Sequence, residues 1–337
     1  MRELATIRKI GGLSPIPNAD RIEVAQVDGW NCVVPKGKYE VGESIIYIEV
    51  DSFLPQGEPR WEHLMKGGQM TEFNSVVGHV LKPAEFKKVL SRGLVIPVLG
   101  FEIGFELGQD MSELLGITKY EKPIPEDWLL KSNGYTSYAI PTTALERIEN
   151  RTDQWDELKM RHWEVTEKLH GTAITYRWEN GEFGASYSSS RLDFNLDSEV
   201  PACVWARKAG LAERLKLNTT RNMAIQGELI GPGICGNYYR LDEHRFYVYD
   251  IYDLDEGQYL RPEVRNALVG KFGLISVPEK AKEARLDHWV DTPAELLEYV
   301  AVEASRVNPL KLVEGWVFKT IDGKRKDFKV ISPKFKG

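Results

Sequence analysis

The chain has 337 residues, of which 44 are Lys or Arg and 50 are Asp or Glu, giving a formal net charge of −6. Its 42% hydrophobic and 28% charged residues are typical of a globular protein and exclude collagen-like, largely disordered and disulfide-stapled chains. The acidic balance argues against a protein that coats nucleic acid through bulk charge, but it is compatible with a local basic groove.

Membrane and disulfide-rich classes are also not expected. No apolar run reaches the roughly 18–20 residues of a membrane span, and the N-terminal segment lacks the apolar core of a signal peptide. Cys32, Cys203 and Cys235 are far apart and form no CxxC pair, which argues against a disulfide framework or a cysteine-based zinc site. We therefore expect a cytoplasmic protein with no membrane contact.

Residues 1–115 are expected to form one small β domain. Short runs rich in β-branched residues alternate with turn signals such as Asp28-Gly29 and Pro35-Lys36-Gly37. Five such strands indicate a small barrel, for which the OB-fold is the commonest solution and an SH3-like barrel the alternative. The expected strands cover residues 3–10, 21–27, 31–34, 44–50 and 94–99.

Residues 116–140 carry prolines without clear periodicity, so we expect a linker there and a second domain over residues 141–337. The second domain mixes runs typical of strands with runs typical of helices, which places the chain in the α+β class. Its expected strands are residues 163–168, 172–178, 223–230, 245–252, 314–319 and 327–331, and its expected helices are residues 198–215, 261–272 and 292–304.

The segment Glu167-Lys168-Leu169-His170-Gly171 places a lysine at a strand end before a small-residue turn. An exposed lysine, with a pKa of about 10.4, is a poor nucleophile, but burial or neighbouring cations lower that value. Alone, the segment is more consistent with a surface lysine before a β-turn.

Four further blocks follow in chain order, most of them strand-like with charged residues near their ends. Together with the first, they resemble the motifs of the covalent nucleotidyltransferases, which comprise ATP-dependent DNA and RNA ligases and mRNA capping enzymes. The matches are Lys168 to Gly171 for motif I, Glu228 for motif III, Tyr249-Asp250 for motif IIIa, Glu314 to Lys319 for motif IV and Lys329 for motif V.

The N-terminal segments Ile16-Pro17-Asn18-Ala19-Asp20 and Gly29-Trp30 are similar to the start of the RNA ligase clade typified by the Deinococcus and Naegleria enzymes. In that clade an OB domain precedes the nucleotidyltransferase domain, whereas the related DNA ligases and capping enzymes carry it afterwards. The domain order therefore favours an ATP-dependent RNA ligase that seals 3′-OH and 5′-phosphate ends, in particular at nicks in duplexes.

The resemblance implies three nucleotidyl transfers. Lys168 attacks the α-phosphorus of ATP, which releases pyrophosphate and leaves a lysyl-AMP; AMP then passes to a 5′-phosphate, and a 3′-OH finally displaces it. Each step is an in-line attack on phosphorus, in which positioning and charge neutralisation supply most of the rate.

The resemblance also implies the groups that surround the nucleotide. Glu228 and Glu314 are the carboxylates expected near Mg²⁺ or Mn²⁺, and a ribose contact is an alternative or additional role for Glu228. The other implied contacts are phosphate neutralisation by Lys329 and Lys319, adenine stacking by Tyr249 rather than Tyr247, adenine recognition by Glu167, and a ribose or phosphate contact by Arg191.

Two positions depart from the family pattern. His170 stands where most of the superfamily has Asp, and an imidazole cannot replace a carboxylate toward hydrated Mg²⁺, so a hydrogen-bonding turn residue is the alternative role. Asp327 precedes Phe328-Lys329 where many ligases have a second lysine, so that phosphate contact is missing or comes from Lys319 or Lys326.

Two regions are candidates for contact with RNA. Residues 319–337 contain seven Lys or Arg and two Asp, which predicts either salt-dependent phosphate binding or a solvated basic tail. In the OB-like domain, Trp30 and Tyr47 are either RNA contacts or core residues. We expect a monomer; the alternative functions are a DNA ligase, a capping-type enzyme, or a non-catalytic RNA-binding protein on a ligase scaffold.

Overall fold

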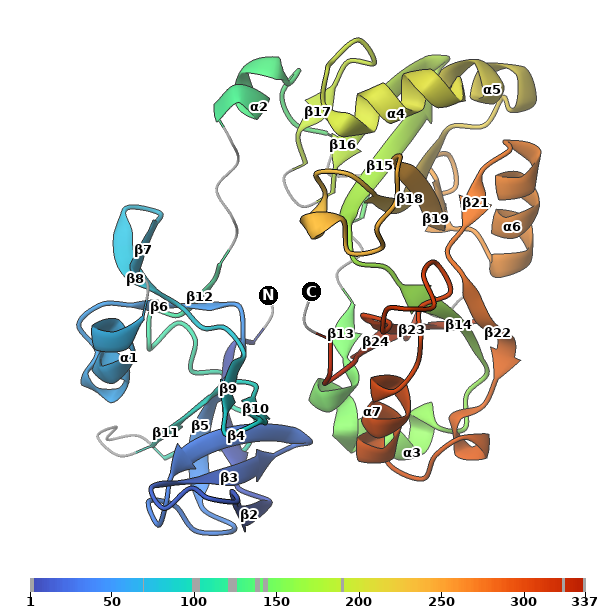
Figure 1. Cartoon of the computed structure of the whole chain (residues 1–337). Helices are drawn as coiled ribbons and strands as arrows, with labels where there is room; N and C mark the ends of the chain where they lie inside the picture. The colour runs from blue at the N-terminus through green and yellow to red at the C-terminus, as the bar shows by residue number, and fades with distance from the viewer. Residues whose placement is uncertain are drawn as a thin grey trace. The chain divides into compact units, whose positions relative to one another are not determined.

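The computed structural model describes residues 3–68, 70–98, 104–120, 126–136, 140–141, 145–188, 191–322 and 325–335, without the side chains of residues 126–128. The chain divides into two compact units, Met1–Pro123 and Ile124–Gly337 (Figure 1). Antiparallel sheets dominate both units and helices flank them, which confirms the α+β class. In the part of the chain that is described, no helix is long and apolar enough to cross a membrane.

The first unit consists mainly of short antiparallel strands. The expected strands are observed, but further short strands were not anticipated because several of them are largely exposed and lack an apolar pattern. The elements are β1 (Ala5–Lys9), β2 (Gly12–Pro15), β3 (Ile22–Val27), β4 (Trp30–Pro35), β5 (Ser44–Ile48), β6 (Ser52–Pro55), α1 (Glu62–Gly67), β7 (Met70–Phe73), β8 (Val76–Val80), β9 (Ala84–Phe86), β10 (Val89–Ser91), β11 (Leu94–Pro97) and β12 (Thr118–Lys119).

Two aromatic rings considered for RNA contact lie in the core of this unit. Trp30 and Tyr47 are each 3% exposed, and their ring centroids are 6.1 Å apart. They pack with Val27 and Val95 in one apolar cluster. The core alternative is therefore correct for both, because neither ring has a surface on which a base could stack.

The second unit contains two sheets, with strand orders β13-β24-β23-β14-β22 and β17-β16-β15-β18-β19-β20. A short strand, β21, pairs in parallel with β19. The elements are α2 (Glu126–Lys131), β13 (Glu146–Arg147), α3 (Trp155–Leu158), β14 (Trp163–Lys168), β15 (Thr172–Glu179), β16 (Glu182–Tyr187), β17 (Asp193–Phe194), α4 (Pro201–Ala209), α5 (Leu211–Asn218), β18 (Met223–Ile230), β19 (Arg245–Asp253), β20 (Gln258–Tyr259), α6 (Pro262–Lys271), β21 (Ile275–Ser276), β22 (Glu279–Ala284), α7 (Pro293–Ala301), β23 (Gly315–Thr320) and β24 (Phe328–Ile331).

Each sheet buries one face under helices (Figure 1). Trp163 and Phe318 of the first sheet pack into a core that includes residues of α3 and α7. Tyr176 and Phe246 of the second sheet pack into a core that includes residues of α4 and α5. Since side chains alternate along a strand, the opposite faces are left for polar residues, and those faces carry the motif residues.

Two segments differ from expectation. The helix expected over residues 198–215 is broken into α4 and α5 at Gly210, whose φ of +61° suits glycine at a helix end. Within residues 116–140, β12 pairs with β6 of the first unit and α2 forms a short helix; residues 121–125 and 137–139 of this stretch lie outside the described part.

Glycines of two motifs are required by close backbone contacts. A Cβ on Gly171 would lie 2.5 Å from the carbonyl oxygen of Leu229, and a Cβ on Gly315 would lie 2.0 Å from that of Val330. These contacts hold the two motifs tightly against β18 and β24. The glycines are therefore explained by packing rather than by chemistry.

We predict that Gly315→Ala destabilises the second unit by roughly 1–3 kcal/mol, because the added methyl group pushes β23 and β24 apart. Gly270→Ala in α6 is the matched control: its Cβ would meet nothing within 4 Å, so it should gain roughly 0.5–1 kcal/mol. Urea unfolding of the two variants measures both; equal stability would contradict the steric explanation.

Candidate active site

Lys168 lies where the chain passes from one sheet to the other. It is the last residue of β14, and Leu169, His170 and Gly171 connect it to β15. Lys168 pairs across the sheet with Gly315, and Glu314 directly precedes that residue. The register therefore brings Lys168 Nζ to a hydrogen bond of 2.6 Å with Glu314 Oε1.

Glu228, on β18 of the other sheet, is the second carboxylate beside Lys168. Its burial, with Glu314 nearby, raises the pKa of Glu228 to about 8 although Lys168 opposes the shift. Burial alone would lower the pKa of Lys168, but Glu314 and Glu228 outweigh it and hold that pKa above the usual value. Burial would raise the pKa of Glu314, but Lys168 and His170 keep it below the usual value.

The two carboxylates fit a divalent cation. Glu314 Oε2 is buried without a hydrogen bond, and His170 Nδ1 lies 3.4 Å away. A carboxyl oxygen of this kind suits Mg²⁺ or Mn²⁺, which keep several waters and use few protein ligands. The described residues contain no cluster of three or more His, Cys, Asp or Glu side chains that could hold a metal ion.

Two further cations share the face of the sheet on which Lys168 lies. Lys329 of β24 pairs with Val317 of β23, and Arg147 of β13 pairs with Lys329. The charge of Arg147 acts against the ammonium form of Lys168, although the two carboxylates outweigh it. Sequence reasoning identified Lys329 but missed Arg147, because Arg147 stands in a two-residue strand outside any motif.

Tyr249 is the extra residue of a β-bulge in β19. Gln226 of β18 pairs with Asp250 and Gly227 pairs with Val248, so Tyr249 has no opposite residue. A bulge of this kind changes the direction of the side chain, and the half-buried Tyr249 packs against the cluster that contains Leu169. Tyr249 thus packs on the cluster that includes the residue after Lys168, and its contact with adenine stays a prediction.

Lys319 is bound within the protein. Its Nζ donates a hydrogen bond of 2.5 Å to the carbonyl oxygen of Tyr249 and lies 3.0 Å from Asp250 Oδ2. Burial lowers the pKa of Lys319 although Asp250 opposes the shift. Lys319 lies opposite Glu164, which is four residues before Lys168 on β14, so Lys319 is further along the sheet than Lys168. The contact of Lys319 with the α-phosphate stays a prediction.

The structure gives Glu167 and Arg191 structural contacts. Glu167 is 1% exposed, and its carboxylate accepts hydrogen bonds from Ser305 Oγ at 2.5 Å and Arg306 N–H at 2.8 Å. Arg191 follows β16 with a φ of +53°, and its carbonyl oxygen accepts a hydrogen bond from the Thr136 N–H. Their roles toward adenine, ribose and phosphate stay predictions.

Much of the positive charge in residues 319–337 is directed at carboxylates. Arg325 lies 3.2 Å from Asp250 and 3.0 Å from Asp327, and Lys326 lies 3.0 Å from Glu157. Lys324 and Lys336 lie outside the described residues. This segment is therefore not simply a free basic surface.

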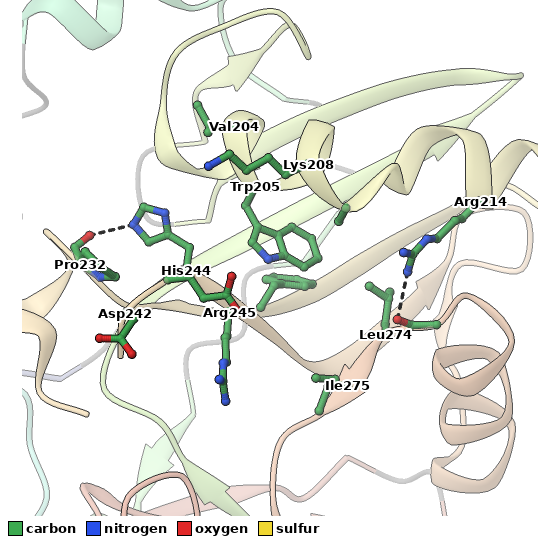
Figure 2. A pocket seen from close by; sticks show the side chains of 14 residues that line it. Val204, Trp205, Lys208, Arg214, Pro232, Asp242, His244, Arg245, Leu274 and Ile275 are labelled. Atoms are coloured by element: carbon green, nitrogen blue, oxygen red, sulfur yellow. Dashed lines mark hydrogen bonds between the residues drawn. The ribbon is translucent and has the colours of Figure 1, made fainter. Parts of the chain in front are cut away.

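A cavity of about 660 Å³ lies on the other side of the second sheet (Figure 2). Trp205 and Phe246 line it, and His244 Nε2 at its edge is 2.7 Å from the carbonyl oxygen of Pro232. Phe246 points away from the face that carries Glu228, which pairs with the neighbouring residue Tyr247. The cavity is therefore distinct from the lysine site.

Comparison with known families identifies both parts of the chain. A model of an OB-fold domain matches residues 4–98, and a model of RNA ligases matches residues 161–335, more than half of the chain. The chain belongs to the RNA ligase family. The N-terminal OB-fold domain and the enzyme class expected from the sequence are thereby confirmed.

Solved structures of Naegleria gruberi RNA ligase are similar to the chain over 98% of its length. A lysine-to-methionine variant with AMP and Mn has 35% identity, 97% coverage of that chain and a TM-score of 0.85. A glutamate-to-alanine variant with ATP and Mn has 34% identity, 98% coverage and a TM-score of 0.84. The enzyme with PPi has 34% identity, 97% coverage and a TM-score of 0.84. No curated protein sequence matches the chain.

We predict that Asp250→Asn costs roughly 3–5 kcal/mol of stability, because it leaves Lys319 buried without its charged partner. The exposed Glu157, which pairs with Arg161 and Lys326, offers a control. Glu157→Gln should leave stability unchanged, since water screens surface ion pairs. Chemical denaturation measures both variants, and a small loss for Asp250→Asn would show that the buried pair is not needed for stability.

Proposed function

We propose that the protein is an ATP-dependent RNA ligase that seals nicks with 3′-OH and 5′-phosphate ends through a lysyl-AMP on Lys168. The observation that carries the proposal is Lys168 Nζ, 2.6 Å from Glu314 and beside Glu228 at the junction of the two sheets. ATP, AMP, Mn and PPi in the similar Naegleria structures support the choice of nucleotide and metal.

The first step requires Lys168 to lose a proton. In the resting site the two carboxylates favour its ammonium form, which cannot attack phosphorus. Glu228 and Glu314 would hold a divalent cation, whose positive charge would disfavour the ammonium form of Lys168 and neutralise phosphate. Lys168 Nζ then forms a bond to the α-phosphorus, and pyrophosphate leaves with the electrons of the broken P–O bond.

Other side chains bind and orient the nucleotide in this proposal. Lys329 and Arg147 neutralise phosphate charge from the same sheet face, and Tyr249 stacks on adenine. Glu167 fixes the segment at Ser305 and Arg306 through its two hydrogen bonds, and any contact with adenine would be additional. His170 acts through its hydrogen-bonded turn, because its backbone N–H donates a hydrogen bond of 2.8 Å to Tyr239 Oη.

In the later steps AMP passes from Lys168 to the 5′-phosphate, and the 3′-OH displaces it to join the strand. Every step is an attack on phosphorus, so one set of cations serves all three. We propose that the chain acts as a monomer with residues 1–115 as the RNA-binding OB domain. The buried free thiols of Cys32 and Cys203 support a reducing cytoplasm as its compartment.

Transfer of label from α-³²P-ATP tests the covalent step. Label that stays on the denatured protein, resists alkali and is released by hot acid should appear on the wild type with Mg²⁺ or Mn²⁺ and vanish in Lys168→Ala, because only this amine can form the phosphoramidate. Lys66→Ala, at an exposed surface pair with Glu62, is the control and should keep the label.

Label transfer and nick sealing together separate the alternative functions. Label from α-³²P-GTP alone would indicate a capping-type enzyme, and sealing of nicked DNA but not of nicked RNA would indicate a DNA ligase. A folded wild type that lacks bound AMP and takes no label from either nucleotide would overturn the catalytic proposal.

We further predict that Glu314→Gln lowers the rate of label transfer by about 10²-fold or more and raises the Mn²⁺ concentration for half-maximal transfer. The amide keeps the shape of the side chain but removes the charge that attracts the cation. Titration of Mn²⁺ with each protein measures the shift. An unchanged metal requirement would place the cation elsewhere.

A further inference from the structure

The β9–β10 hairpin of the first unit, residues 82–91, is an exposed basic element that we call the basic hairpin. All three residues of β9 are exposed, and in the described part of the chain β9 pairs with β10 alone. Its charged residues are Lys82, Lys87 and Lys88 against Glu85, within a chain of net charge −6. Positive charge is thus concentrated here against the overall balance.

The basic hairpin is attached firmly at its base. Ser91 Oγ accepts a hydrogen bond of 3.0 Å from the Val33 N–H, and the Arg92 N–H donates one of 2.9 Å to the carbonyl oxygen of Asn31. Both contacts join the hairpin to β4. Its tip is therefore held in position before any partner binds, which reduces the entropy lost on binding.

Lys87 and Lys88 occupy an unfavourable backbone conformation at this tip. Phe86 pairs with Val89, so the loop has two residues, and the φ angles of Lys87 and Lys88 are +50° and +69°. A two-residue loop with positive φ at both positions strongly prefers Asn-Gly or Asp-Gly. Lysine has neither the freedom of glycine nor the local hydrogen bonds of asparagine to offset the strain.

The same chain shows which residues such turns otherwise contain. Three more two-residue hairpin loops with positive φ at both positions occur in the described residues, and each begins with Asn or Asp. They are Asp28-Gly29, Asn74-Ser75 and Asn180-Gly181. The Lys-Lys turn is the exception among them, so the requirements of the turn do not explain its lysines.

An exposed aromatic ring lies next to the two lysines. Phe86 is 42% exposed. No other aromatic side chain among the described residues of the first unit is exposed to this extent. Trp30 and Tyr47, the aromatic residues considered from the sequence, are in the core. A ring beside two ammonium groups is the combination that binds a nucleic acid strand through base stacking and phosphate contacts.

We propose that the basic hairpin binds the RNA substrate, with Lys87 and Lys88 on consecutive phosphates and Phe86 against a base or ribose of the same strand. This assignment rests on the proposed ligase function and names the element of the OB domain that holds the RNA strand. The backbone strain at the tip is retained because it presents both ammonium groups outward.

The double variant Lys87→Asn/Lys88→Gly separates binding from folding. It introduces the residues that the turn prefers, so its melting temperature should rise by roughly 2–4 °C. Its affinity for nicked duplex RNA should fall, and the slope of log K against log salt concentration should decrease by about 2, one for each lost contact. Label transfer from ATP to Lys168 should stay at the wild-type rate.

Three further variants complete the test. Ser75→Gly relieves the same strain in a turn without lysines, so it should gain stability and leave RNA affinity unchanged. Lys87→Arg/Lys88→Arg should retain the affinity and the salt slope, since both charges remain. Phe86→Ala should weaken RNA binding by about fivefold or more through loss of stacking, with the salt slope unchanged.

A double variant that is more stable and binds RNA with unchanged affinity and slope would overturn the inference while leaving the ligase proposal intact. If the wild type instead takes no label and seals no nick, the proposed function fails. In that case the RNA affinities of the wild type and the double variant would still test whether the basic hairpin binds RNA.

Discussion

The site depends on the hydrogen bond between Lys168 and Glu314. Lys168 lies where the chain passes from the first sheet to the second, and Glu314 directly precedes β23, so this contact links the two positions. The hydrogen bond of 2.6 Å forms only if β14 and β23 are in register and Gly315 lies against the carbonyl oxygen of Val330. Gly171 imposes the same constraint on the other sheet through its contact with Leu229. Lys168 is thus placed by backbone contacts on both sides.

Apart from Lys329, the Lys, Asp and Glu residues of the five motifs divide into two groups with different physical roles. Lys168, Glu228 and Glu314 form a cluster in which the two carboxylates hold the pKa of Lys168 above its usual value. Asp250 and Lys319 form a buried ion pair further along the strands, joined by Arg325. The second group fixes β19 against β23, and through the bulge it also fixes Tyr249. A motif residue therefore need not contact the substrate to be required.

Positively charged residues also serve two different roles in this chain. In residues 319–337, several cations face carboxylates within the protein, and such pairs hold strands and loops together. In the basic hairpin, lysines occupy a strained turn at an exposed tip, where a structural role would be served better by other residues. An acidic protein can in this way bind a polyanion through a few positioned cations rather than through its net charge.

The sequence by itself determined the α+β class, the N-terminal OB-fold domain, the order of the motifs and the positions of most long strands, because these depend on local periodicity and on residue types at fixed spacing. It did not reveal the break at Gly210, the many short exposed strands or the burial of Trp30, since each depends on what packs against the segment. Arg147 was missed for the same reason: its proximity to Lys168 arises from pairing between β13, β24, β23 and β14, strands far apart in the chain. Only the tertiary structure decided that Lys319 binds Asp250 and that Lys87 and Lys88 share a strained turn, because register and backbone φ angles are fixed by contacts that no local pattern encodes.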